Sequence, residues 1–75
     1  MNNLLLIKAE KWLSELGIKT IACPTCLMVS RDGIENLYGI GVSYQAFLDE
    51  VKIGIDSNRI HWTHKDDNWL YMDTL

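Results

Sequence analysis

The chain has 75 residues, of which 48% are hydrophobic and 23% are charged, and ten acidic side chains against seven basic ones give it a net charge of −3. This composition is that of a globular chain and excludes a disordered one, and the length predicts a single small domain over residues 1–75. Because no run of basic residues could neutralise a phosphate backbone, we expect no nucleic acid among the partners.

The N-terminus does not have the pattern of a membrane or export segment. Its apolar run is only Leu4–Ile7 and ends at Lys8, whereas a membrane-spanning helix needs ~20 apolar residues. We therefore expect a cytoplasmic protein with no membrane partner, in which both cysteines are reduced thiols.

The first predicted element is a helix over roughly Asn3 to Leu16. Asn2 or Asn3 is suited to cap its start, and Gly17 suits the left-handed position after its last turn. Its apolar side chains recur at the spacing of one helical face. The residues that define this face are Leu5, Ala9, Trp12 and Leu16.

Strands are predicted next, over Ile18–Cys23 and over Leu27–Val29, with a tight turn between them. The residue pair Asp32-Gly33 is typical of a two-residue hairpin, which would make Ile34–Tyr38 a third strand. A competing interpretation is a helix over the same residues, because Asp32 is followed three residues later by an acid that could complete a capping box. We favour the hairpin.

A second helix is predicted from Tyr44 to about Ile53, with Ser43 as its cap and Gly54 after its end. Together with the first helix it would cover a small sheet. The expected fold class is therefore α+β, with two helices on a mainly antiparallel sheet in the order helix, strand, hairpin, helix, hairpin.

The last predicted element is a hairpin in which Arg59–His64 pairs with Trp69–Asp73 across a loop of residues 65–68. A four-residue loop would place Trp62 opposite Tyr71, and His64 opposite Trp69. Three of these rings would then lie on one face, rimmed by acids, which is a composition typical of binding surfaces. The candidate interface residues are Trp62, Trp69, Tyr71, Asp66 and Asp67.

Two cysteines and two histidines raise the hypothesis of a zinc site, with Cys23, Cys26, His61 and His64 as its four ligands. In a regular strand the two histidines point to opposite faces, so both reach one ion only if the strand bulges between them. The alternative is a purely structural role, in which the cysteines pack as small apolar side chains and the histidines are ordinary hairpin residues. Zinc is the alternative to our leading expectation of no cofactor.

The segment Ile18–Cys26, an apolar strand that runs into Cys-Pro-Thr-Cys, resembles the active-site entry of the thioredoxin and glutaredoxin superfamily. The resemblance implies a dithiol oxidoreductase in which Cys23 attacks and Cys26 resolves, with a helix opening at the motif. The residues after Cys26 favour a strand instead, and the chain has no second proline to match the family's cis-proline.

No catalytic set emerges from the remaining residues, so the leading hypothesis is not an enzyme. We expect a small acidic intracellular module that binds another protein, as an inhibitor or an adaptor, through the aromatic hairpin surface. Self-association into a homodimer is the related alternative, and packing of the same rings into the core is the structural one.

Overall fold

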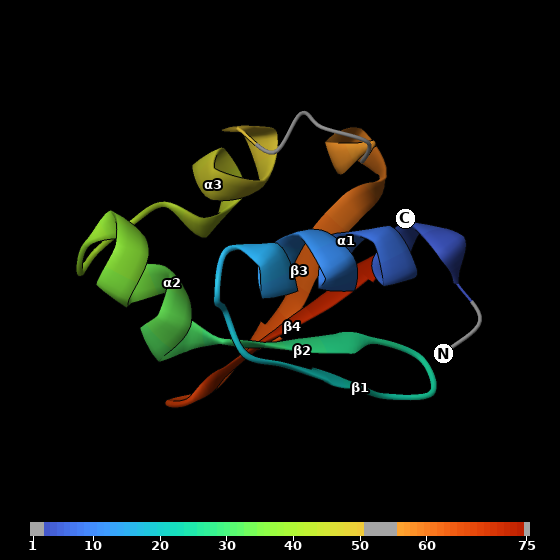
Figure 1. The fold of residues 1–75 in the computed structure, drawn as a ribbon, viewed down its shortest axis with the longest axis horizontal. Coiled ribbons are helices and arrows are strands. Elements are labelled where there is room, and N and C mark those ends of the chain that lie inside the picture. The colour runs from blue at the N-terminus through green and yellow to red at the C-terminus, as the bar shows by residue number, and fades with distance from the viewer. Residues whose placement is uncertain (1–2, 51–55, 75) are drawn as a thin grey trace.

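Strands and helices alternate irregularly in this chain and build an antiparallel sheet with helices on one side (Figure 1). The structure is a computed structural model, and it describes residues 3–50 and 56–74. The strands are β1 (Thr20–Ala22), β2 (Leu27–Ser30), β3 (Ile60–Lys65) and β4 (Trp69–Thr74). The helices are α1 (Leu4–Glu15), α2 (Arg31–Tyr38), α3 (Tyr44–Glu50) and the short 3-10 turn η1 (Ser57–Arg59). The α+β fold class is confirmed.

Helix α1 forms where the sequence predicts it and uses the predicted signals at both ends. The Asn3 side chain accepts hydrogen bonds from the backbone amides of Leu5, at 3.0 Å, and Leu6. After the last turn Gly17 adopts a φ of 81°, which allows the Ile18 amide to bond back to the helix. With the chain reversed after this turn, the apolar face of α1 packs on the sheet.

The residues expected to form a third strand, Ile34–Tyr38, are helical, so the favoured hairpin is wrong and the competing helix is right. Ser30, rather than Asp32, caps α2, because its hydroxyl accepts from the Gly33 amide at 3.1 Å. Gly33 has none of the positive φ that a two-residue hairpin turn would need. Ile34 is fully buried, so its packing also favours the helix.

Helix α3 begins as predicted, with the Ser43 hydroxyl accepting from the Ala46 amide at 3.3 Å. Its described part ends at Glu50, and the predicted end near Ile53 and the stop at Gly54 lie outside the described residues. None of the helices in the described ranges is long and apolar enough to cross a membrane.

The β3–β4 hairpin forms, but its register differs from the expected one. Trp62 pairs with Met72 and His64 pairs with Tyr71, so the expected pairing of Trp62 with Tyr71 is wrong. Two changes cause this difference: the connecting turn is shorter than expected, and β3 bulges at Thr63. A bulge adds one residue to one strand and so changes which residues share a face.

The sheet has the strand order β1-β2-β4-β3, and α1 and α3 pack on the same side of it (Figure 1). The buried core lies between these two layers, and α2 closes one end through Ile34. The core consists of Leu6, Ala9, Leu13, Ile18, Leu27, Val29, Ile34, Phe47, Leu48, Ile60, Leu70 and Met72.

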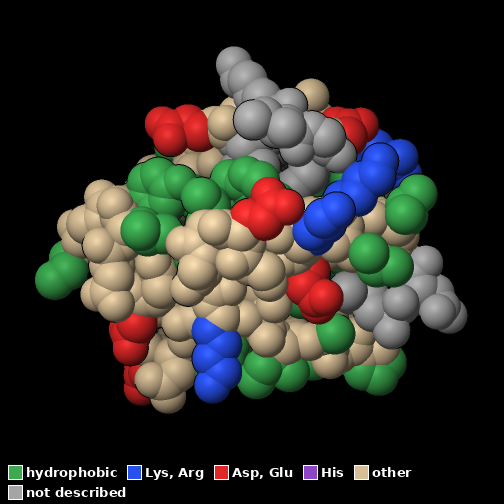
Figure 2. Space-filling model, in the orientation of Figure 1, with side chains coloured by type: hydrophobic (Ala, Val, Ile, Leu, Met, Phe, Trp, Pro, Cys, Tyr) green, Lys and Arg blue, Asp and Glu red, His purple; other side chains and the backbone are tan. Residues whose placement is uncertain are grey.

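Figure 2 shows hydrophobic side chains gathered over the α2–α3 side of the molecule, in the same view. Three apolar residues from the end of α2 and the following connection are exposed: Leu37 by 54%, Tyr38 by 43% and Ile40 by 94%. They form an exposed apolar surface on the side of the molecule that carries the helices.

Candidate functional site

The side of the sheet that faces away from α1 and α3, here called the open face, is the candidate site. No helix of the described residues lies over it (Figure 1). Because side chains alternate along a strand, it receives the residues between the core positions. These residues are Ile21, Met28, His61, His64, Trp69, Tyr71 and Asp73.

One row of side chains crosses the whole open face. Ile21 of β1 pairs with Met28 of β2, Met28 pairs with Tyr71 of β4, and Tyr71 pairs with His64 of β3. Ile21 is 42% exposed, the next two are half-buried, and His64 is exposed. Paired side chains on one sheet face are in contact distance, so the row is a continuous and mostly apolar strip.

Tyr71, at the centre of this strip, is fixed from two sides. Its hydroxyl donates to a carboxylate oxygen of Asp66 at 2.9 Å, and its ring lies 5.1 Å from the His64 ring between centroids. The Asp66 carboxylate, together with partial burial, raises the pKa of the Tyr71 hydroxyl. The phenol therefore stays protonated at neutral pH and its ring orientation is set before any partner arrives.

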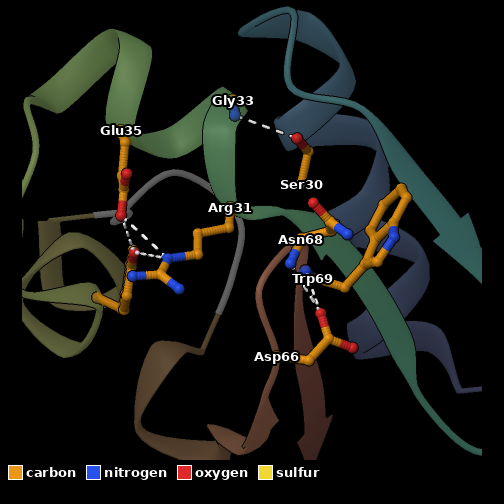
Figure 3. Close-up of polar contacts among 8 residues, drawn as sticks. Ser30, Arg31, Gly33, Glu35, Asp66, Asn68 and Trp69 are labelled. Atoms are coloured by element: carbon orange, nitrogen blue, oxygen red, sulfur yellow. Dashed lines mark hydrogen bonds and ion pairs between the residues drawn. The ribbon is translucent and has the colours of Figure 1, made fainter.

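Asp66 also organises the turn between β3 and β4 (Figure 3). One of its carboxylate oxygens accepts from the Asn68 amide at 2.9 Å and from the Trp69 amide at 2.7 Å. These two backbone amides are the main reason that the pKa of Asp66 lies below its usual value, and the Tyr71 hydroxyl lowers it further. A single ionised side chain thus holds both the turn and the central aromatic ring of the strip.

The predicted interface residues do not all meet on this face. Trp69 and Tyr71 lie on it, Asp66 is half-buried in the adjoining turn, and Asp67 is exposed in the same turn. Trp62 lies on the helix side, where its ring centroid is 6.3 Å from that of Tyr44. The aromatic surface is therefore built around two of the three expected rings.

Sequence reasoning missed Ile21 and Met28, which complete the strip on the side of β1 and β2. Both were expected to lie in strands, and neither was assigned to the interface. Met28 stands in the continuous apolar run Leu27–Val29, so its alternation with the buried Leu27 and Val29 is visible only in the structure. Ile21 is exposed because β1 is an edge strand and none of the described helices covers this side of it.

The two cysteines meet at the tip of the β1–β2 hairpin, where they flank Pro24 and Thr25. The Cys23 amide donates to the Cys26 carbonyl at 2.9 Å, and both thiols are free and half-buried. Burial, followed by a hydrogen bond with the Cys23 thiol and the nearby Asp73 carboxylate, raises the pKa of Cys26. In the absence of a bound ion this thiol is protonated at neutral pH.

The histidines are placed on the same side of the sheet by the bulge that a shared zinc site would require. His61 pairs with Asp73 and His64 with Tyr71. However, the described residues contain no group of three or more His, Cys, Asp and Glu side chains that could hold one metal ion. The structure therefore joins Cys23 to Cys26 but does not join this pair to the histidines.

The thiol geometry also differs from what the resemblance to thioredoxin implies. Strand β2 begins at Leu27, directly after the second cysteine. The expected helix is therefore replaced by a strand, as the residue pattern after the motif favoured. In that superfamily a helix begins at the motif, and its amino end lowers the pKa of the nucleophilic thiol. In this chain the residues after Cys26 continue as strand β2 and do not provide such a helix end.

A second polar cluster lies on the helix side and ties α2 to α3 (Figure 3). The Arg31 guanidinium donates to Glu35 at 3.1 Å, and the Tyr44 hydroxyl donates to the same carboxylate at 2.6 Å. These bonds, that from Tyr44 foremost, lower the pKa of Glu35. The Lys65 ammonium, 5.1 Å from the Tyr44 ring centroid, adds a cation–π contact from β3. The cluster holds the helices in place over the sheet.

Searches against protein-family models, curated proteins and solved structures find no protein significantly similar to this chain.

Proposed function

We propose that this chain is a protein-binding module and that the open face is its binding surface. The observation that carries the proposal is the row Ile21, Met28, Tyr71 and His64, which crosses all the strands of the sheet and is covered by none of the helices in residues 3–50 and 56–74. A partly exposed apolar strip with aromatic side chains is the composition that protein interfaces favour. An inhibitor or adaptor acting in the cytoplasm is the role we propose.

The surroundings of the strip define the chemistry of the partner. Asp66 and Asp67 lie at one end of the hairpin, and Asp73 lies on the open face near the other end. These acids favour a partner that offers apolar side chains to the centre and Lys or Arg side chains to the margin. Opposite charges at the margin would speed association and fix orientation more than they would add affinity.

Preorganisation supports the same conclusion. Tyr71 is held by Asp66, and Asp66 is held by two backbone amides of the turn. An anchor side chain whose rotamer is already fixed loses little conformational entropy when it binds. The acid in this turn therefore supports the binding surface as well as the hairpin.

The test is site-specific photo-crosslinking in cells of the source organism, with benzoylphenylalanine in place of Ile21 in one variant and of Ile40 in another. Ile40 is 94% exposed and lies outside the open face, between α2 and α3, so it is the matched control. We expect position 21 to give a discrete adduct with one protein and position 40 to give none. Adding Tyr71→Ala to the position-21 variant should remove the adduct.

The reverse labelling pattern contradicts the proposal. An adduct formed at position 40, or one at position 21 that persists undiminished with Tyr71→Ala, would place the binding surface elsewhere. An adduct with a second copy of the chain would identify the partner as a homodimer subunit. Circular dichroism of each variant confirms that the fold is intact before the adducts are compared.

A further inference from the structure

The hairpin tip presents two sulfur ligands side by side. Cys23 and Cys26 flank the two-residue connection Pro24-Thr25, and the backbone bond of 2.9 Å between them closes the turn. Both thiols are free and half-buried, and their residues face each other across the turn. This is the arrangement in which two thiolates two residues apart can bind the same ion.

A structural zinc ion needs four ligands, and one chain supplies only these two. Every Cys, His, Asp and Glu of the sequence lies within residues 3–50 and 56–74. Among those residues no three such side chains are grouped so that they could hold an ion. The site is incomplete within one chain, and an identical pair of thiols from a second copy would complete it.

We propose that one Zn²⁺ ion joins two copies of this chain through the Cys23 and Cys26 thiolates of each. The ion has tetrahedral coordination by four sulfur atoms, the arrangement found in closed structural zinc sites. Four thiols release four protons to solvent as four zinc–sulfur bonds form, so the reaction needs no oxidant or reductant. This inference uses the Cys23 and Cys26 thiols and not the aromatic strip, which lies on the same side of the sheet.

The surroundings of the tip suit the approach of a second copy. The β1–β2 connection lies at one end of the sheet (Figure 1), and Ala22, Pro24 and Thr25 are exposed there. No charged residue occurs between Lys19 and Arg31 along the chain. The segment that carries the thiols therefore adds no charge of its own to a contact between two tips.

The experiment is a titration of the reduced, metal-free full chain with Zn²⁺, followed by native mass spectrometry and sedimentation velocity. We expect saturation at one zinc for two chains, with conversion of monomer to dimer and return to monomer when a chelator is added. Substituting Co²⁺ should give the intense visible absorption of a tetrahedral tetrathiolate site. This spectrum identifies the ligands independently of the change in mass.

Matched variants separate this site from its alternatives. Cys23→Ser and Cys26→Ser should each lose the zinc-dependent dimer while circular dichroism shows an unchanged fold. His61→Asn and His64→Asn should leave the dimer and the Co²⁺ spectrum as they are. Tyr71→Ala, which tests the open face, should also keep the zinc dimer.

Three results would overturn the inference. One is a single zinc bound per chain with loss of binding in the histidine variants, which is the site within one chain. Another is the absence of zinc binding at micromolar concentrations. The third is a dimer that persists in chelator and in both cysteine variants.

Discussion

The two faces of the sheet use alternate residues of the same strands for different purposes. On β4, Leu70 and Met72 are 0% and 1% exposed beneath the helices, whereas Trp69 and Tyr71 between them are only half-buried on the open face. On β2, the buried pair is Leu27 and Val29. The comparison shows that one face of this sheet supplies the stability of the domain and the other remains available for contact.

The bulge in β3, an edge strand of the sheet, preserves the separation between buried and open-face side chains on that strand. In a regular strand Trp62 and His64 would share a face, since side chains repeat with a period of two. The extra residue at Thr63 places Trp62 with Met72 and His64 with Tyr71. The larger apolar ring therefore packs toward the core, and the polar ring joins the open face.

The largest effect that distinguishes the faces is expected for Leu70→Ala. Leu70 is fully buried, so its truncation removes apolar contacts and leaves a cavity, at a cost of about 2–5 kcal/mol. A chain of this length has a total stability of about 4–11 kcal/mol, so much of it is lost. Urea unfolding followed by tryptophan fluorescence measures the change. The comparison variant is Ile21→Ala on the open face, and an equal loss of stability in both would contradict the division into two faces.

A smaller effect is expected for the two tryptophans, which the sequence pattern placed together. Trp62→Ala should lower the free energy of unfolding by less than the about 3–5 kcal/mol typical of a core tryptophan, because its ring is only partly buried against the core and beside Tyr44. Trp69→Ala should cost less stability, because none of the helices that the structure describes packs over it, but should remove the crosslink formed at position 21. If Trp62→Ala removes the crosslink and leaves stability unchanged, the assignment of these rings to the faces is reversed.

Much of the fold follows from local signals that the sequence carries. Helix α1 has a cap at Asn3 and a stop at Gly17, and both act as the pattern predicts. Helix α2 was only the competing interpretation, because Asp32-Gly33 is a strong hairpin signal when it is considered alone. The deciding contacts are the Ser30 cap and the burial of Ile34, and the second of these depends on residues distant in sequence. Tertiary packing thus overrode a local turn preference.

The candidate site was predicted only in part, for a related reason. Trp69, Tyr71 and the acids of the turn were identified from composition, but their pairing depends on the hairpin register. A shift of one residue exchanges the two faces of a strand. Neither the bulge at Thr63 nor the Asp66 hydrogen bonds that shorten the turn have a clear signature in the residue pattern. Ile21 could be assigned to the open face only from the strand order, which places β1 beside β2.

The smallest effect, and the most specific, concerns Asp66 and pH. Because the folded state lowers the pKa of this carboxyl, its ionised form stabilises the fold above the ordinary carboxyl pKa, and that stabilisation disappears as the pH falls through the folded-state pKa. Asp66→Asn keeps an oxygen for the turn amides but loses the charge. We expect a lower urea midpoint than wild type at neutral pH and a difference that shrinks as the pH falls below the ordinary carboxyl range. Asp67→Asn, in the same turn but exposed, is the control, and identical pH profiles for the two variants would show that the Asp66 charge does not hold the turn.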